Sequence, residues 1–258
     1  MDIQLANNIK RVAIEHHIDV PLIVGGYVRD SILGLENQIQ DIDLTTNNPD
    51  VLRLAVQFAH NNNFYYKIFN DLHITIYSDK YKNLDFSSNF NSKLAIEFFK
   101  NKNFSEKKYY EIISRDFTIN TLHMSMFNNK IIDPLNVGQK DCDLRLIRAT
   151  SSPEICLKDD PRRAYRAVSI ASKLNFKIDG SMVDYIRANH SNFVPEKVGA
   201  ISEPYITANI DKVIGINDDV LLGYLIDTGL LSCVPLIGKY KDLLIKNNMI
   251  SIYLDSIK

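Results

Sequence analysis

The sequence has few cysteines, almost no net charge and no long hydrophobic run. Three cysteines among 258 residues, odd in number and far apart, favour free thiols in a reducing, cytoplasmic compartment and exclude a disulfide framework or a Cys/His zinc site. No segment approaches the roughly 20 apolar residues that span a bilayer. The N-terminal segment lacks the apolar core and cleavage site of a secretory signal, so we expect neither export nor membrane contact.

The charge balance limits how the chain could bind nucleic acid. The formal net charge is −1, so binding would need a local basic face. Residues 145–190 hold more basic than acidic side chains. That excess indicates either a modest face for an RNA backbone or the solvated side of a helical domain. A hydrophobic content of 45% permits a sizeable core in one or two domains.

The hydrophobic pattern predicts an α+β fold with its strands mainly in the first half of the chain. Strands interspersed with helices are typical of a mixed sheet packed by helices. The elements expected there are a helix over 3–17, a strand over 19–24, a short helix over 27–34, a strand over 41–46, a helix over 50–60 and three strands in FYYKIF, LHITIYS and YKNLDFS.

From about residue 104 onward the pattern is mostly helical. The change near residue 145 predicts a domain boundary at that point. Aromatic residues at 64–69 and 98–110 are expected in the core, with base-stacking platforms as the alternative. The helices expected in this half are 105–114, 159–174, 180–190, 199–213 and 217–231.

Two aspartates lie one residue apart in DIDLTT. On a strand, Asp41 and Asp43 point to the same face, and Asp85 in KNLDFSS is a possible third carboxylate from a neighbouring strand. A cluster of like charges costs free energy unless a cation compensates it, and carboxylate oxygens are ligands that suit Mg²⁺. The alternative is a pair of solvated turn aspartates.

A glycine pair precedes these aspartates. Gly25 and Gly26 can bring backbone N–H groups close to an anion where the next helix begins, and Arg29 can add a charged donor for phosphate. Together with the aspartates they predict a triphosphate cradle beside a two-metal site. The expected chemistry is in-line attack of a hydroxyl on an α-phosphate.

Four ordered motifs carry a resemblance to a known family. VGGYVRD with DIDLTT, SRDFTINTL (114–122), IIDPLNVGQKDCDLRLIRA (131–149) and DDPRRAYRA (159–167) resemble the tRNA nucleotidyltransferase and bacterial poly(A) polymerase family, the class II branch of the polymerase-β-like nucleotidyltransferases. The resemblance implies an α+β nucleotidyltransferase head over 1–145, an all-helical neck over 146–215 and a shortened helical body over 216–258. It also implies Mg²⁺ on Asp41 and Asp43, and nucleotide contacts from Gly26, Arg29, Arg115 and Arg166.

The fourth motif suggests how a base could be selected without a template. Asp160, Arg163 and Arg166 recur every third residue, so on a helix they share one stripe, which could equally be a solvated face with an i,i+3 ion pair. A carboxylate acceptor beside a guanidinium donor matches the amino group and ring nitrogen of cytosine and adenine, and mismatches uracil and guanine. The resemblance implies this role for Asp160 and Arg163.

The sequence departs from the family pattern in two places. Ser169 occupies a position that usually carries arginine, and residues 86–114 lack the usual arginine-rich, glycine-containing loop. We therefore expect transfer of C and/or A from CTP and ATP to a tRNA 3′ end, as full or partial CCA addition, with no DNA partner. The alternatives are poly(A) synthesis, nucleotidyl transfer to a protein or small molecule, and a non-catalytic RNA- or nucleotide-binding module.

Overall fold

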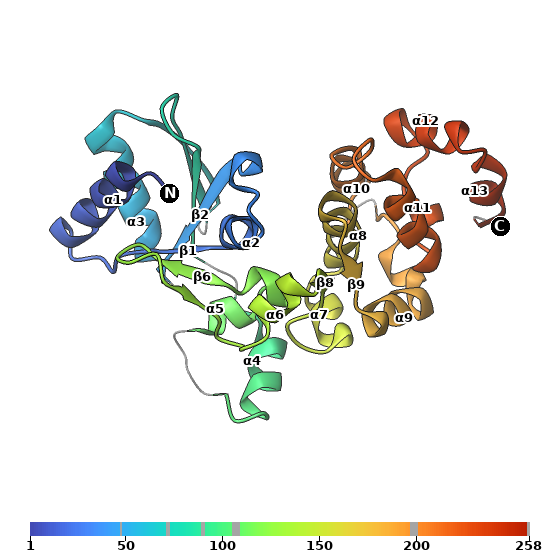
Figure 1. Cartoon of the computed structure of the whole chain (residues 1–258), viewed down its shortest axis with the longest axis horizontal. Coiled ribbons are helices and arrows are strands. Elements are labelled where there is room, and N and C mark those ends of the chain that lie inside the picture. The colour runs from blue at the N-terminus through green and yellow to red at the C-terminus, as the bar shows by residue number, and fades with distance from the viewer. Residues whose placement is uncertain (47, 71–72, 89–90, 105–108, 197–200, 257–258) are drawn as a thin grey trace. The chain divides into compact units, whose positions relative to one another are not determined.

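The computed structural model describes residues 1–46, 48–70, 73–88, 91–104, 109–196 and 201–256, and they form two compact units (Figure 1). The first unit is Met1–Cys142 and the second is Asp143–Lys258. The predicted α+β class is confirmed. The predicted boundaries at residues 145 and 215 stay predictions.

A mixed seven-stranded sheet forms the centre of the first unit. Its order is β3-β4-β5-β2-β1-β6-β7, in which β2 and β5 are parallel and the other neighbours are antiparallel. The strands are β1 (Leu22–Val24), β2 (Asp41–Thr45), β3 (Tyr65–Asn70), β4 (His73–Tyr77), β5 (Asn83–Ser87), β6 (His123–Ser125) and β7 (Ile131–Ile132).

Helices cover one face of this sheet. Helix α3 (Asp50–Asn62) contacts β3, β4 and β5 and packs against α1 (Ile3–Glu15). The core beneath consists of alternate strand residues, including Ile42, Leu84 and Phe86, which are buried. Because successive side chains alternate between faces, the polar residues of β2 and β5 point to the opposite face. The shorter helices are α2 (Gly26–Ile32), α4 (Lys93–Lys100), α5 (Tyr110–Ile113) and α6 (Gly138–Asp143), and the turns η1 (Glu36–Gln38) and η3 (Thr118–Asn120) are 3₁₀-helical.

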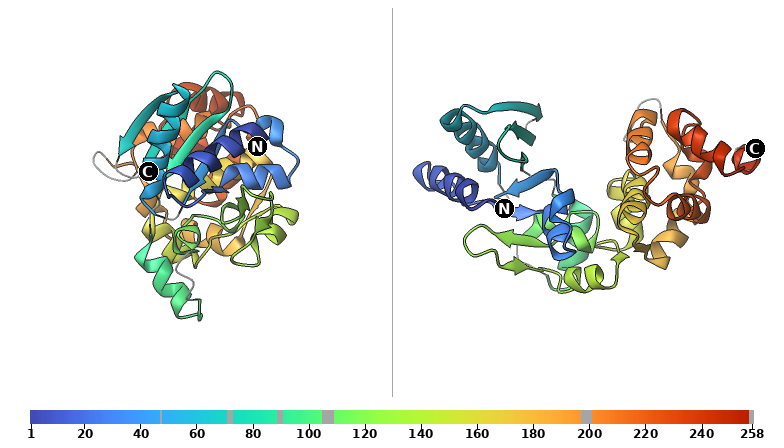
Figure 2. Two further views of the ribbon diagram at one scale, coloured as in Figure 1. Left: turned by 90° about the vertical axis from the view of Figure 1, so that its left-hand side faces the viewer. Right: turned by 45° about the horizontal axis from the view of Figure 1, so that its top comes forward.

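The second unit packs helices around α8 (Arg163–Leu174). Helix α8 contacts α7 (Pro153–Asp159), α10 (Glu203–Asp211) and α11 (Asp218–Asp227). Its buried Tyr165 donates a 2.5 Å hydrogen bond to the Phe193 carbonyl. The remaining elements are α9 (Gly180–Ala188), η4 (His190–Phe193), η5 (Leu231–Cys233), α12 (Gly238–Lys246), α13 (Ile250–Ser256) and the parallel pair β8 (Leu146–Ile147) and β9 (Lys177–Ile178) (Figure 2).

The single helix predicted over 159–174 is wrong at its start. Helix α7 ends at Asp159, Asp160 is extended at φ −149° and ψ 101°, and α8 begins at Arg163. The reason is Pro161, because a proline ring disfavours helical conformation in the residue before it. The all-helical prediction beyond residue 145 also missed β8 and β9, which have only two residues each.

Two further predictions need correction or restriction. Tyr65 and Phe69 are 70% and 48% exposed, so the core assignment of these aromatic side chains is wrong, whereas Phe99 is buried as expected. Of the helices expected over 105–114 and 199–213, residues 105–108 and 199–200 lie outside the described residues. The described parts contain α5 and α10.

The cysteines are free thiols, as predicted, and all three are buried. Among the described residues, the helices are too short or too polar to cross a bilayer.

Candidate active site

The two aspartates of β2 lie on the face of the sheet opposite the buried core. Asp43 is half-buried and Asp41 is exposed. Ile42, which lies between them, and Leu44, which follows Asp43, are buried. The neighbouring strand β5 runs parallel and pairs Asp85 with Asp43 and Asn83 with Asp41. The Asn83 amide donates to Asp41 Oδ1 at 3.1 Å. Alternation on two strands therefore brings three carboxylates to one face, as the sequence predicted.

Asp85 is held by strand β4. The Thr75 hydroxyl donates a short hydrogen bond to Asp85 Oδ1, and His73 Nε2 lies 3.2 Å from the same oxygen. Among the described residues, no three acidic, histidine or cysteine side chains converge closely enough to hold a metal ion. Asp85 thus lies beside Asp43 without joining a three-carboxylate cluster.

The donor set of Asp41 and Asp43 fits Mg²⁺. This ion commonly uses one or two carboxylates and completes its shell with substrate phosphates and water. Two hard oxygen donors on one face of β2, one exposed and one half-buried, match that pattern.

Gly25 brings the first two motifs together. Its φ is +69°, and a Cβ there would lie 2.6 Å from Asp43 Oδ2 and 3.2 Å from Arg115 Nη1. A backbone conformation and a close approach that only glycine permits therefore place the turn, Asp43 and Arg115 at one point. Arg115 lies in the loop after α5, so the structure brings three of the predicted site residues into contact range.

Arg29 is buried and bonded to other protein groups. Its Nε and Nη2 atoms lie 2.7 Å from Asp30 Oδ1, and Nη1 donates to Asn120 Oδ1 at 2.9 Å. Asn120 in turn donates to Asp116 Oδ1 at 2.8 Å. The guanidinium also lies against Gly26, since a Cβ there would be 3.4 Å from Nη2. No site role was predicted for Asp30, Asn120 or Asp116, although all three lie in the quoted motifs.

The third motif packs against the second. A Cβ at Gly138 would lie 2.6 Å from the Thr118 carbonyl, and the Thr118 hydroxyl donates to Asp141 Oδ2 at 2.6 Å. Glycine is therefore needed for this close packing, which fixes the segment that follows Arg115.

The nucleotide-selecting residues predicted in the second unit are arranged differently from the expected i,i+3 pair. Asp160 binds Arg162, which donates from Nε at 2.8 Å and from Nη2 at 2.9 Å. This hydrogen bond to the carboxylate raises the pKa of the Arg162 guanidinium. Arg163 is buried, donates to the Cys156 carbonyl at 3.1 Å and lies 3.6 Å from Asp159 Oδ2.

The physical reason for this difference is the position of the helix start. Asp160 precedes α8, so it is not on the stripe that Arg163 shares with the exposed Arg166. Ser169, where the family usually has arginine, donates its hydroxyl to the Asn209 carbonyl at 3.1 Å. That side chain therefore faces α10.

Comparison with known proteins identifies relatives of both units. Residues 22–148 match the family described as the poly A polymerase head domain. The tRNA nucleotidyltransferase cca2 of Schizosaccharomyces pombe is 28% identical over 193 residues, covering 64% of this chain and 37% of that protein. The CC-adding tRNA nucleotidyltransferase of Halalkalibacterium halodurans is 28% identical over 230 residues, covering 89% of this chain and 54% of that protein.

A solved structure has the same fold. The CCA-adding enzyme of Bacillus stearothermophilus in complex with CTP superposes with a TM-score of 0.72 at 24% identity, covering 95% of this chain and 57% of that chain. This chain thus spans between about a third and three fifths of the length of these relatives. Residues 22–148 thus match a poly A polymerase head domain, and the chain is similar to tRNA nucleotidyltransferases over most of its length.

Proposed function

We propose that this chain is a template-independent nucleotidyltransferase that adds C and/or A from CTP and ATP to the 3′ end of tRNA. The observation that carries the proposal is the convergence of Gly25, Asp43 and Arg115 beside the exposed Asp41. The two carboxylates can hold a metal, and the Arg115 guanidinium can bind phosphate. Their meeting at a glycine turn suits transfer of a nucleoside monophosphate.

The proposed reaction forms one bond and breaks one. The RNA 3′-hydroxyl oxygen attacks the α-phosphorus, the bond to the β-phosphate oxygen breaks, pyrophosphate leaves and the hydroxyl proton is released. Asp41 and Asp43 would hold Mg²⁺, which supplies positive charge at the attacking and leaving oxygens. Asp85 would support Asp43 from the adjacent strand, and Arg115 would bind the triphosphate.

Two arginine roles follow from the contacts described above. Arg29 is engaged by Asp30 and Asn120, so it would hold the turn at Gly25 and Gly26 in shape while that turn faces the phosphates. Arg166, which is exposed on α8, would contact triphosphate or ribose.

Base selection would use Asp160 and Arg163. An acceptor and a donor side by side match cytosine and adenine. Asp160 is bonded to Arg162, and Arg163 to the Cys156 carbonyl. Binding of the base would therefore exchange these two sets of hydrogen bonds for contacts with the nucleotide.

The names of the relatives point to different products. The relative that covers 89% of this chain is named a CC-adding enzyme, whereas the head-domain family takes its name from poly(A) synthesis. The test is incubation with Mg²⁺ and a tRNA transcript that lacks its 3′ CCA, with each NTP singly and with CTP plus ATP. Three added nucleotides with both NTPs mean CCA addition, two with CTP mean CC addition, and a long ladder with ATP alone means poly(A) synthesis.

Failure to extend any RNA would contradict the proposal. In that case AMP or CMP transfer to a protein or small molecule would be tested next. RNA binding without any turnover would identify a binding module.

A further inference from the structure

Exposed aromatic rings form two stacked pairs at the edge of the head sheet. Tyr65 of the edge strand β3 stacks on Tyr77 of β4, with ring centroids 5.7 Å apart. Phe69, at the other end of β3, stacks on His73 with centroids 5.0 Å apart. Tyr65 is 70% exposed, so its pair is open to a further ring, and Phe69 is 48% exposed, with Lys67 Nζ over its ring. We call these four side chains the aromatic strip.

The aromatic strip lies on the face that carries the proposed metal ligands. Register partners on neighbouring strands project to the same face, and so do alternate residues of one strand. Tyr65 and Tyr77 are register partners, and on the same face they lie next to a row of further register partners. His73 contacts Asp85, which belongs to this row. The row crosses four strands in the order Lys67, Thr75, Asp85 and Asp43.

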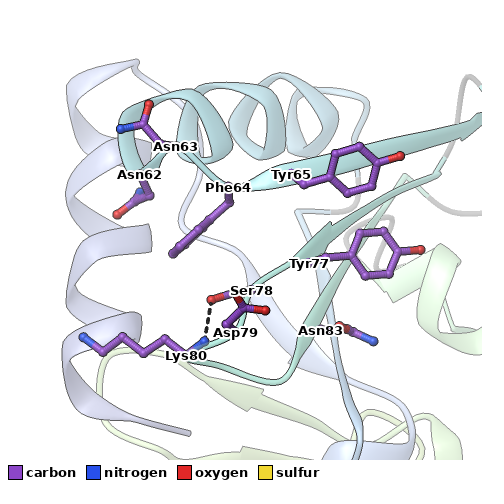
Figure 3. A pocket seen from close by; sticks show the side chains of 9 residues that line it. All are labelled: Asn62, Asn63, Phe64, Tyr65, Tyr77, Ser78, Asp79, Lys80 and Asn83. Carbon is purple, nitrogen blue, oxygen red and sulfur yellow. Dashed lines mark hydrogen bonds between the residues drawn. The ribbon is translucent and has the colours of Figure 1, made fainter.

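An open hollow adjoins the tyrosine pair. Its volume is about 630 Å³, within the range of small-molecule sites of roughly 300–1,000 Å³. Figure 3 shows Tyr65 and Tyr77 projecting to the same side from neighbouring strands, with Asn83 on the next segment. Asn83, which lines the hollow, also donates to Asp41 Oδ1 at 3.1 Å. Its lining includes Phe64, Tyr65, Tyr77, Asp79, Lys80 and Asn83.

The reaction requires a path for the strand that brings the 3′-hydroxyl. If that hydroxyl reacts at Asp43, the RNA nucleotides that precede it must lie on the protein surface next to Asp43. Three strand spacings of about 4.8 Å put the edge strand about 14 Å from β2, a span of roughly four stacked nucleotides at 3.4 Å each. Unpaired bases stack on aromatic side chains, and cations beside the rings bind the backbone. Lys67 Nζ lies 4.8 Å from the Phe69 ring centroid and can supply that charge.

We propose that the aromatic strip binds the unpaired 3′-terminal nucleotides of the acceptor RNA by base stacking, an inference that rests on the proposed function. The stacked pairs hold the bases, Lys67 contacts the phosphates, and the strand ends at Asp41 and Asp43. A duplex does not fit this role, because its bases already stack on one another.

The test measures binding without turnover. The full chain in EDTA is titrated into two fluorescein-labelled RNA hairpins, one with a four-nucleotide unpaired 3′ tail and one blunt. Stacking contributes about 1–3 kcal/mol per base, so Tyr65→Ala and Phe69→Ala should each weaken binding of the tailed hairpin by about fivefold or more. The blunt hairpin should bind these variants as it binds the unchanged chain, and Tyr65→Phe should retain affinity for the tail.

Phe127→Ala is the matched control. Phe127 is 67% exposed and lies 5.7 Å from Lys10 Nζ, so it resembles Tyr65 in exposure and Phe69 in its lysine neighbour, but it lies near β6 at the other edge of the sheet. Its loss should leave affinity for the tail unchanged. Wild-type affinity for the tail in the Tyr65→Ala, Phe69→Ala double variant, or equal losses for both hairpins, would overturn the proposal.

The outcomes separate this inference from the proposed function. If the unchanged chain extends tRNA but the strip variants bind the tail normally, the role of the aromatic strip is refuted and the proposed transferase activity stands. If the unchanged chain extends no RNA but the variants lose binding of the tail, the proposed transferase activity is refuted and the role of the aromatic strip is supported.

Discussion

Arg29 and Asn120 are 91 residues apart in the chain and are joined by a 2.9 Å hydrogen bond from Arg29 Nη1 to Asn120 Oδ1. Both side chains are buried, and Asn120 donates onward to Asp116 at 2.8 Å. A single amide therefore connects the helix that follows the glycine turn to the segment that carries Arg115. Asp43 and Arg115 both lie against Gly25 of that turn.

We predict that Asn120→Ala destabilises the head and lowers its activity. The substitution removes the buried bond from Arg29 Nη1 and one of the bonds to Asp116 Oδ1, which still accepts from the Phe117 N–H. The loss of these buried bonds costs about 1–3 kcal/mol. Urea unfolding and kcat/KM for CMP or AMP transfer measure the two effects. Asn128→Ala is the control, because that exposed amide accepts a local bond from the Lys130 N–H. Equal stability of both variants would refute the role given to Asn120.

We predict that Gly25→Ala abolishes transfer, whereas Gly34→Ala preserves it. Both glycines have positive φ, +69° and +70°, so an added Cβ strains both backbones by about 1–2 kcal/mol. Only at Gly25 does the new atom meet other groups, at 2.6 Å from Asp43 Oδ2, while at Gly34 nothing lies within 4 Å. Transfer rates of the two variants, compared at equal fraction folded, separate strain from collision. Equal losses would mean that the approach of Asp43 to the turn is unimportant.

The sequence was sufficient where local periodicity decided the structure. The alternation of DIDLT predicted that Asp41 and Asp43 share a face, and β2 has that pattern. It was insufficient where distant segments meet. Nothing local marks Asn120 as the partner of Arg29, and β6 is only three residues long, held by pairing with β1.

Residue spacing was misleading at the fourth motif. Asp160, Arg163 and Arg166 have helical spacing, yet Pro161 ends that periodicity before it includes Asp160. The expectation that Tyr65 lies in the core failed for a different reason. An edge strand exposes one face, and hydrophobicity alone does not tell which aromatic residues of FYYKIF point to it.

We predict that Arg163→Ala relaxes discrimination among the four NTPs. A well-placed guanidinium contributes about 1–3 kcal/mol to base discrimination, so the preference for CTP or ATP over UTP should fall about fivefold or more. Initial rates with each NTP measure the effect, and Arg163→Lys, which retains a charge near Asp159, shows how much of the loss comes from folding. Unchanged selectivity in both variants would remove Arg163 from base recognition.

Arg162→Ala tests whether Arg162, rather than Arg163, acts with Asp160 in base recognition. It frees Asp160 from its bidentate contact, so binding of the preferred NTP should be retained or tightened. A loss of selectivity here, with none at Arg163, would transfer the base-reading role to Arg162.

We predict that the second unit loses stability in alkaline solution. Burial raises the pKa values of Tyr165 and Tyr240 above the ordinary 10.0 and that of Cys233 above 9.0. The folded groups stay protonated while the unfolded groups ionise, so their contribution is complete below pH 9 and falls as pH rises through 9 and 10. Each group then lowers the unfolding free energy by about 1.4 kcal/mol per pH unit. Urea midpoints between pH 8 and 11 that do not fall would contradict this.

The central claim is that Asp43 and its neighbours transfer nucleotides to RNA. The most direct measurement is extension of a tRNA transcript lacking CCA, with Mg²⁺, CTP and ATP, by the unchanged chain and by Asp43→Asn. Asp184→Asn is the control, because its carboxylate is exposed in the second unit and pairs with the neighbouring Arg187 at 3.3 Å. The account predicts extension by the unchanged chain and by the control, and none by Asp43→Asn in its folded state. Extension by Asp43→Asn at the unchanged rate would contradict it.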